Sequence, residues 1–252
     1  MILTALAGRR LRPIPAARIW FISNLSVYIP AGPGWQILQM GVMSAEEGIG
    51  AVPAGAASII NAAINIACGL AVAAIAGAGT VARVLEPYAW IGWTAAIIAV
   101  IAVFFLPLIL PVVFRIAHDR LKLAVPLATP PARVIFGAAA ANVVAWVMYG
   151  LALKGLALGI LGTATGSIAQ YTAAFAAAYI FGYLLFVIPG GIGAREGLLI
   201  KVLLAAGVAT GAGASLLAIG SRLLLIVVQV LPALLFLACR RRPIDEKANP
   251  AG

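Results

Sequence analysis

The chain consists mainly of long apolar runs separated by short polar segments. A helix that crosses a bilayer needs about 20 mostly apolar residues. Runs of at least that length occupy residues 54–78, 88–114, 132–153 and 167–188. A fifth run, at 214–239, is long enough although Arg222 lies in its interior. Because the runs are continuous and rich in Ala and Leu, without the alternation of a membrane barrel, the pattern predicts an all-α, polytopic integral membrane helix bundle.

Two shorter apolar stretches, 14–29 and 196–209, complete the pattern. The first carries Arg18 among its apolar residues and the second carries Lys201. Stretches of this length are typical of re-entrant or interfacial segments more than of full spans. We therefore expect short broken or re-entrant segments in addition to the spanning helices.

Composition confirms that lipid is the solvent. The chain is 64% hydrophobic and 10% charged, with a mean hydropathy of +1.12, whereas a soluble domain is roughly 45–50% apolar and about 25% charged. This composition excludes a soluble enzyme, a disordered tail and a secreted scaffold. With only Cys68 and Cys239, the chain has no disulfide framework. The net charge of +10 is not accompanied by a basic stripe interleaved with aromatics, so we expect no nucleic-acid partner.

The basic residues predict an orientation. They cluster at 9–18, 115–133 and 240–247, and cytoplasmic loops are enriched in Lys and Arg. Alternating crossings from a cytoplasmic N-terminus place the first two clusters inside. The third is inside only if 196–209 is a crossing. A re-entrant hairpin there would leave an odd number of crossings and place the third cluster on the opposite side of the membrane. We therefore expect a short sixth crossing and a cytoplasmic C-terminus in a bacterial inner membrane.

Arg222 is the residue that lipid should tolerate least. A charge at mid-bilayer costs about 2.5–3.5 kcal/mol on the insertion scale, so such residues face partners or water. Ser215, Arg222 and Gln229 are spaced by seven, which places all three on one helical face. Two interpretations stay open: Arg222 is a structural ion-pair partner of Glu196, or it belongs to a phosphate or carboxylate site facing an internal cavity.

A glycine-rich break precedes the last helices. Its members are Pro189, Gly190, Gly191, Ile192, Gly193, Ala194, Arg195, Glu196 and Gly197. Pro and clustered Gly end the preceding helix, and irregular backbone at membrane depth survives only against protein or water. The next helix starts with free N–H groups that favour an anion, and Arg195 adds a positive charge. The alternative is an ordinary cytoplasmic turn with a capped helix.

A second break lies near the start of the chain and includes Tyr28, Pro30, Gly32 and Trp35. Paired Gly/Pro-interrupted segments are typical of a transporter binding site at a repeat interface. Chance similarity between two Gly/Pro turns is the alternative. The expected topology also places both breaks on the same side of the membrane, which does not fit a simple inverted repeat.

Other polar positions predict contacts between helices and no binding site. Asn61, Asn65 and Cys68 share one helical face and Tyr179 and Tyr183 share another, and we expect both sets to make interhelical contacts. One His, few carboxylates and no recognisable catalytic motif predict a protein that is not an enzyme and uses no metal or cofactor.

These motifs together resemble the flippase-like family that includes the membrane region of lysylphosphatidylglycerol synthetases. The resemblance covers roughly residues 15–239. It rests on Pro189 to Glu196, a short apolar helix at 198–206, Gly207-Val208, Arg222, and the early turn with Tyr28, Pro30, Gly32 and Trp35, in which Ala31 stands where the family has Gly. It implies a basic stub at 1–13 with an incomplete N-terminus, a flippase-like transmembrane domain at 14–239 and a cytoplasmic basic tail at 240–252.

The resemblance and the charges lead to two hypotheses. In the first, the protein binds or flips an anionic lipid such as a phospholipid, an aminoacyl-phospholipid or a polyprenyl phosphate. The headgroup site would comprise Arg195, Glu196, Arg222, Gly191, Gly193, Gln229 and Ser215. In the second, the protein is a non-transporting partner subunit that presents a lipid-linked substrate to a lipid-modifying enzyme or glycosyltransferase. The oligomeric state is left open, with a homo-oligomer among the alternatives.

Overall fold

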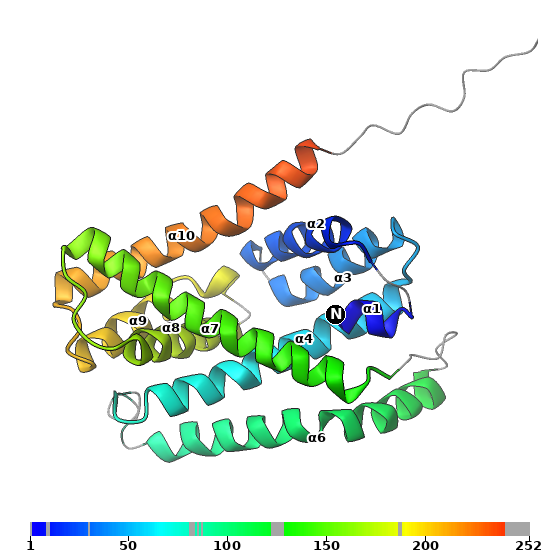
Figure 1. The fold of residues 1–252 in the computed structure, drawn as a ribbon, viewed down its shortest axis with the longest axis horizontal. Coiled ribbons are helices and arrows are strands. Elements are labelled where there is room, and N and C mark those ends of the chain that lie inside the picture. Colours follow the sequence, from blue (N-terminus) through cyan, green and yellow to red (C-terminus); the bar gives the residue numbers. More distant parts are fainter. Residues whose placement is uncertain are drawn as a thin grey trace, which may run out of the picture.

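Four long apolar helices form the frame of the molecule. The computed structural model describes residues 2–8, 11–29, 31–80, 84, 86, 88–121, 129–185 and 188–239. The frame helices are α4 (Ala51–Ala76), α6 (Ala89–Leu121), α7 (Ala132–Leu161) and α10 (Gly211–Ala238) (Figure 1). Each is long and apolar enough to cross a membrane. The predicted all-α bundle is confirmed, and so are the runs at 54–78, 88–114, 132–153 and 214–239.

The remaining helices are shorter. They are α1 (Ile2–Leu6), α2 (Pro13–Asn24), the 3-10 turn η1 (Leu25–Tyr28), α3 (Gly32–Ala45), α8 (Ile168–Leu184), the 3-10 turn η2 (Pro189–Gly191) and α9 (Ala194–Ala205). Within the predicted N-terminal stub, α1 packs against α4 and α7 and buries Ile2 and Leu6. The basic tail at 240–252 lies outside the described residues.

The helices α8 and α9 are the two arms of one hairpin. With 17 and 12 residues they rise about 26 Å and about 18 Å, less than the roughly 30 Å of a hydrocarbon core. They pack together, and η2 joins them near the middle of the bundle (Figure 1). Their other ends lie together, where the Thr165 hydroxyl donates to the carbonyl of Val208 at 3.2 Å.

This hairpin corrects the expected topology. The run at 167–188 is not a crossing of its own, and the short sixth crossing over 196–209 is wrong. The predicted side of the C-terminus does not change. The helices α8 and α9 return the chain to the end of the bundle at which it entered, and α10 then crosses once. The physical reason is local: Pro189 begins η2, and Gly190, Gly191 and Gly193 have φ of 57°, 64° and 85°, which glycine adopts without steric cost.

A second hairpin, formed by α2, η1 and α3, enters from the opposite end. Its arms of 12 and 14 residues rise about 18 Å and about 21 Å. Its turn meets the first at the centre, since a Cβ on Gly190 would lie 3.8 Å from both Tyr28 Cδ1 and the carbonyl oxygen of Val27. The two breaks therefore face each other near the middle of the bundle, and the expectation that they lie on the same side is wrong.

Each hairpin is followed by a long helix that packs against the other hairpin. The helix α4 follows the hairpin of α2 and α3 and packs against α8, while α10 follows the hairpin of α8 and α9 and packs against α2. Rings of Phe21 in α2 and Phe236 in α10 stack with their centroids 6.2 Å apart. The two hairpin-plus-helix units thus run in opposite directions, the arrangement of an inverted repeat.

Close approach of α4, α7 and α8 depends on two glycines. A Cβ on Gly150 would meet Thr172 Oγ1 at 1.9 Å, and one on Gly69 would meet Ile180 Cδ1 at 2.5 Å. Such small residues let membrane helices pack tightly. A larger residue at position 150 would have to separate α7 from α8, because a Cβ there would also lie 2.6 Å from Thr172 Cα, whereas at position 69 it would displace the Ile180 and Trp146 side chains.

Polar contacts between helices support this packing. The Asn65 amide donates to Asn142 Oδ1 at 2.7 Å, the Trp146 indole to the Asn65 carbonyl at 3.3 Å and the Cys68 thiol to the Ala139 carbonyl at 3.6 Å. The interhelical contacts predicted for Asn65 and Cys68 are confirmed. Asn61 lies beside this set and lines a cavity with Asn142.

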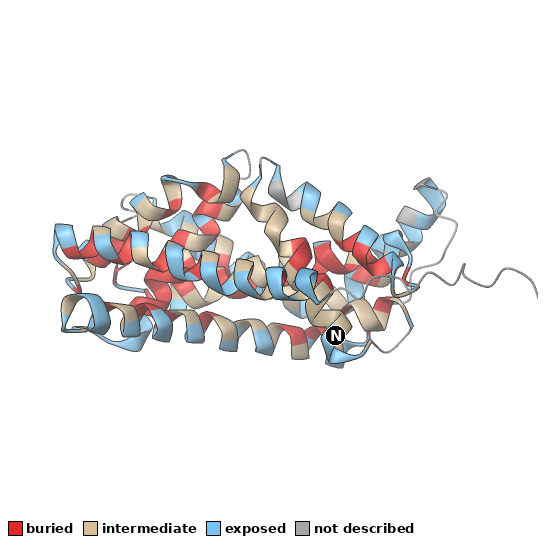
Figure 2. Cartoon of the chain, turned by 90° about the horizontal axis from the view of Figure 1, so that it is seen from above, coloured by how far each residue is buried: buried red, intermediate tan, exposed pale blue. Residues whose placement is uncertain are grey.

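The outer surface is apolar. Figure 2 shows buried residues along the interior and exposed ones around it. On α6, Ile97, Phe104 and Leu108 are 57%, 64% and 69% exposed, an exposure that water would penalise and lipid does not. The basic residues of the expected inner clusters that the structure describes lie at one end of the bundle (Figure 1). They are Arg12 and Arg18 at the start of α2, Arg115 and Arg120 at the end of α6, and Arg133 at the start of α7.

Candidate functional site

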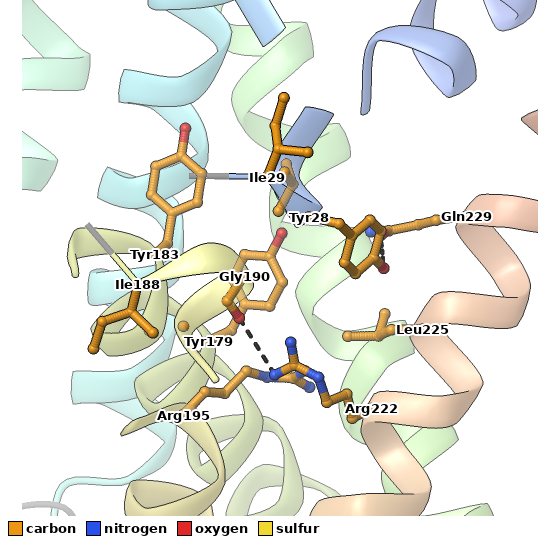
Figure 3. Close-up of a pocket in the computed structure, with 13 residues that line it drawn as sticks. Tyr28, Ile29, Tyr179, Tyr183, Ile188, Gly190, Arg195, Arg222, Leu225 and Gln229 are labelled. Carbon is orange, nitrogen blue, oxygen red and sulfur yellow. Dashed lines mark hydrogen bonds between the residues drawn. The ribbon is translucent and has the colours of Figure 1, made fainter. Parts of the chain in front are cut away.

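A pocket lies where the two hairpin turns meet α10, and it is the candidate site (Figure 3). Its cavity volume is about 50 Å³, and the pocket opens outward. Its lining residues come from η1, α8, η2, α9, α10 and the segments beside the turns: Val27, Tyr28, Ile29, Tyr179, Gly182, Tyr183, Ile188, Gly190, Gly191, Arg195, Arg222, Leu225 and Gln229. The site therefore combines residues from both breaks that the sequence singles out.

Arg222 forms an ion pair with Glu196 beside the pocket. Arg222 Nη1 lies 2.7 Å from Glu196 Oε1 and also donates to the Gly190 carbonyl at 3.4 Å. The other carboxylate oxygen, Oε2, accepts the backbone N–H of Gly193 at 2.7 Å. Glu196 thus neutralises Arg222 and satisfies a free donor at the start of α9, where the helix dipole also favours a negative charge. The predicted pair is present.

Arg195 is the more deeply buried arginine, with 6% of its surface exposed. Its Cζ lies 5.2 Å from the centroid of the Phe175 ring and 5.7 Å from that of Tyr179, within the range of cation–π attraction. Its Nε and Nη2 are buried without a hydrogen-bond partner. A buried guanidinium with two unpaired donors is costly, so an acceptor at this position would stabilise the site.

An aromatic column supports Arg195. The rings of Tyr149, Phe175, Tyr179 and Tyr183 follow one another with centroids 5.0, 6.1 and 6.5 Å apart and interplanar angles of 15°, 18° and 12°. Tyr179 and Tyr183 were expected as interhelical contacts only, yet both line the pocket. The spacing of four between Phe175, Tyr179 and Tyr183 places them on one helical face and could have revealed the column, although not its arginine.

Gly182 makes room for Arg195, and sequence reasoning missed it. A Cβ on Gly182 would lie 2.8 Å from Arg195 Cβ. A Cβ on Gly191 would lie 2.6 Å from Gly182 Cα, and one on Gly190 would lie 2.9 Å from Arg222 Nη2. In the break at Pro189, Gly191 is therefore required by its close approach to the backbone of Gly182 as well as by its positive φ.

The Tyr28 hydroxyl donates to Gln229 Oε1 and so joins the hairpin of α2 and α3 to α10. Both residues line the pocket, as predicted for a site between the breaks (Figure 3). Tyr28, Gln229 and Arg222 supply polar groups to one side of the pocket, and Arg195 supplies its charge from α9. A small anion would meet donors from both hairpin-plus-helix units.

Other predicted residues lie elsewhere. Ser215 donates to the Gly211 carbonyl at 2.9 Å on its own helix and does not line the pocket, because seven residues separate it from Arg222 by about 10 Å along the axis. Trp35 is 51% exposed on α3. Pro189 and Gly193 shape the break without lining the pocket. Gly32 begins α3, and Pro30 lies outside the described residues.

Among the described residues, no group of three His, Cys, Asp or Glu side chains could hold a metal ion. No protein-family model, curated protein or solved structure matches the chain. The site must therefore be interpreted from its own geometry.

Proposed function

We propose that this membrane protein binds the anionic headgroup of a lipid at mid-depth and moves it between the leaflets, as the resemblance to the flippase-like family implies. The observation that carries the proposal is Arg195, which lines a pocket between two facing hairpins and whose Nε and Nη2 are buried without a hydrogen-bond partner. A buried guanidinium of this kind favours a charge-assisted, forked contact with a phosphate.

The arrangement of the hairpins supports movement as well as binding. Each hairpin enters from one end of the bundle and stops at the pocket, so a small displacement of either could open the site toward that end. Among the described residues, the hydrogen bond from Tyr28 to Gln229 joins the two units across the pocket, while Arg222 binds the Gly190 carbonyl within the unit of α8, α9 and α10. Broken helices that meet at a repeat interface are the usual site of alternating access.

The orientation follows from the basic residues. We place the end that holds Arg12, Arg18, Arg115 and Arg133 in the cytoplasm, because Lys and Arg are enriched in cytoplasmic loops. The C-terminal end of α10 then lies on the same side. The loop between α7 and α8, which contains Thr165, lies on the opposite side.

Reconstitution tests the proposal. Purified protein is placed in liposomes, and transbilayer movement of labelled phosphatidylglycerol and of a labelled polyprenyl phosphate is followed. The test variant is Arg195→Gln, and the control is Arg133→Gln, which removes an exposed arginine at the start of α7. We expect movement by the wild type and the control, and its loss in Arg195→Gln.

Folding of every variant is checked by helical circular dichroism and monodispersity. Folded wild type that moves and binds neither lipid would contradict the proposal. Movement that survives in folded Arg195→Gln would contradict the site assignment. Binding without movement would favour the partner-subunit hypothesis, which co-purification with a lipid-modifying enzyme would then test.

A further inference from the structure

The charges around the pocket add up to one unbalanced positive charge. Among the described residues, Arg195 and Arg222 are the only charged residues that line it, and Glu196 is bonded to Arg222. Two guanidinium groups and one carboxylate leave a net charge of +1. Because the pocket is walled mainly by Tyr, Leu, Ile, Val and Gly residues, mobile ions in bulk water screen this charge less than they would screen a charge at the surface.

The two arginines have different tasks. Arg222 is occupied by Glu196 and the Gly190 carbonyl, and its position is fixed by both. Arg195 has two buried N–H-bearing nitrogens without a partner, and no carboxylate within the described part of the chain forms an ion pair with it. The site therefore holds one guanidinium without a carboxylate partner and one that is already neutralised.

We infer that the pocket is built for a phosphodiester, a phosphate that carries a single negative charge and two ester links. This inference rests on the proposed function and narrows its substrate class. A phosphodiester neutralises the site, with its two unesterified oxygens facing Arg195. A terminal phosphomonoester carries about −1.5 to −2 at pH 7 and would leave the buried site with an excess negative charge beside Glu196, which is unfavourable.

The same count argues against a headgroup with an additional ammonium group. Such a group would need a carboxylate, and Glu196 already accepts from Arg222 and from the Gly193 N–H. Diester phospholipids without a second charge fit the pocket best, and phosphatidylglycerol is the simplest probe of that class.

Equilibrium binding to the purified protein in maltoside micelles, which contain no phosphate, tests the inference. Two labelled lipids with identical acyl chains are compared at pH 8, phosphatidylglycerol as the diester and phosphatidic acid as the monoester. We expect the wild type to bind the diester about tenfold more tightly, a preference that corresponds to about 1.4 kcal/mol. Arg133→Gln, the exposed control, should behave as the wild type.

Variants that change the net charge of the site sharpen the test. Glu196→Gln makes it +2, the double variant Glu196→Gln/Arg222→Gln restores +1, and Arg222→Gln makes it 0. The affinity ratio of monoester to diester should rise by about tenfold in Glu196→Gln, return to the wild-type value in the double variant and fall in Arg222→Gln. If one single variant fails to fold, the other and the double variant still test this order.

The outcomes separate the two proposals. If neither lipid binds to folded protein, the proposed function itself fails. If both lipids bind and their ratio is the same in all variants, or if the wild type prefers the monoester, the proposed function stands and the charge-count inference is overturned. Glycerophosphoglycerol, the same headgroup without acyl chains, should compete much more weakly, and equal competition would overturn a lipid as the source of the diester.

Discussion

Replacement of Gly182 by Ala should displace Arg195 and destabilise the protein. The added Cβ would lie 2.8 Å from Arg195 Cβ and 3.6 Å from Arg195 Cα, whereas carbon atoms in contact are normally about 3.5–4.0 Å apart. The start of α9 must therefore move away from α8 by roughly 0.7 Å or more. Arg195 cannot simply rotate away, because the clash involves its first side-chain carbon.

The magnitude follows from overpacking. An extra carbon in a closely packed interior costs about 1–3 kcal/mol. For a domain of this size about 2 kcal/mol corresponds to a decrease in Tm of about 4–8 °C. Because the displaced residue carries the unpaired donors of the pocket, lipid binding should weaken as well.

Gly197→Ala is the matched control. Gly197 lies in the same helix as Arg195, is exposed, and a Cβ there would meet nothing within 4 Å. Ala in a helix interior is favoured over Gly by roughly 0.5–1 kcal/mol, so this variant should be neutral or slightly more stable.

Free energies of unfolding are measured by titration of micellar protein with a denaturing detergent, and lipid binding is measured on the same samples. We expect Gly182→Ala to lose stability and affinity and Gly197→Ala to keep both. Equal stability of the two variants would refute the close approach of α8 and α9. Lost stability with unchanged lipid affinity would refute the role of Arg195 in binding.

Three further predictions follow from other contacts. Glu196→Gln and Arg222→Gln should each destabilise the protein by about 1–3 kcal/mol, while the double variant costs less than their sum; additive values in a double-mutant cycle would show that the pair is not coupled. Ala31 is the one non-glycine with positive φ among the described residues, at 57°, so Ala31→Gly should raise the free energy of unfolding by about 1 kcal/mol, and a decrease would contradict this backbone conformation. A membrane-impermeant maleimide applied from the cytoplasmic side should label the exposed Cys239 and not an Ile192→Cys thiol at mid-depth; labelling of the latter from that side would favour the six-crossing topology.

Local properties of the sequence determined much of the fold. The apolar runs predict α4, α6, α7 and α10 because the transfer of a helix into lipid depends on the residues of that helix alone. The breaks at Tyr28 and at Pro189 were recognisable for the same reason, since Gly and Pro act on the backbone where they stand. The ion pair between Glu196 and Arg222 was also predictable, because each of these two charges needs a partner in lipid.

Only the tertiary structure decided how these parts combine. Hydropathy gives the length of an apolar stretch and not the direction in which the chain leaves it, so it predicts a crossing at 167–188, where the structure has one arm of a hairpin. The contact between Tyr28 and Gln229 joins residues 201 positions apart, and no local pattern specifies such a pairing. The burial of Arg195 against Phe175 and beside Gly182 likewise depends on how α8 and α9 fold back on each other. Helices form from interactions within a few residues, whereas the site forms from contacts between segments that only packing brings together.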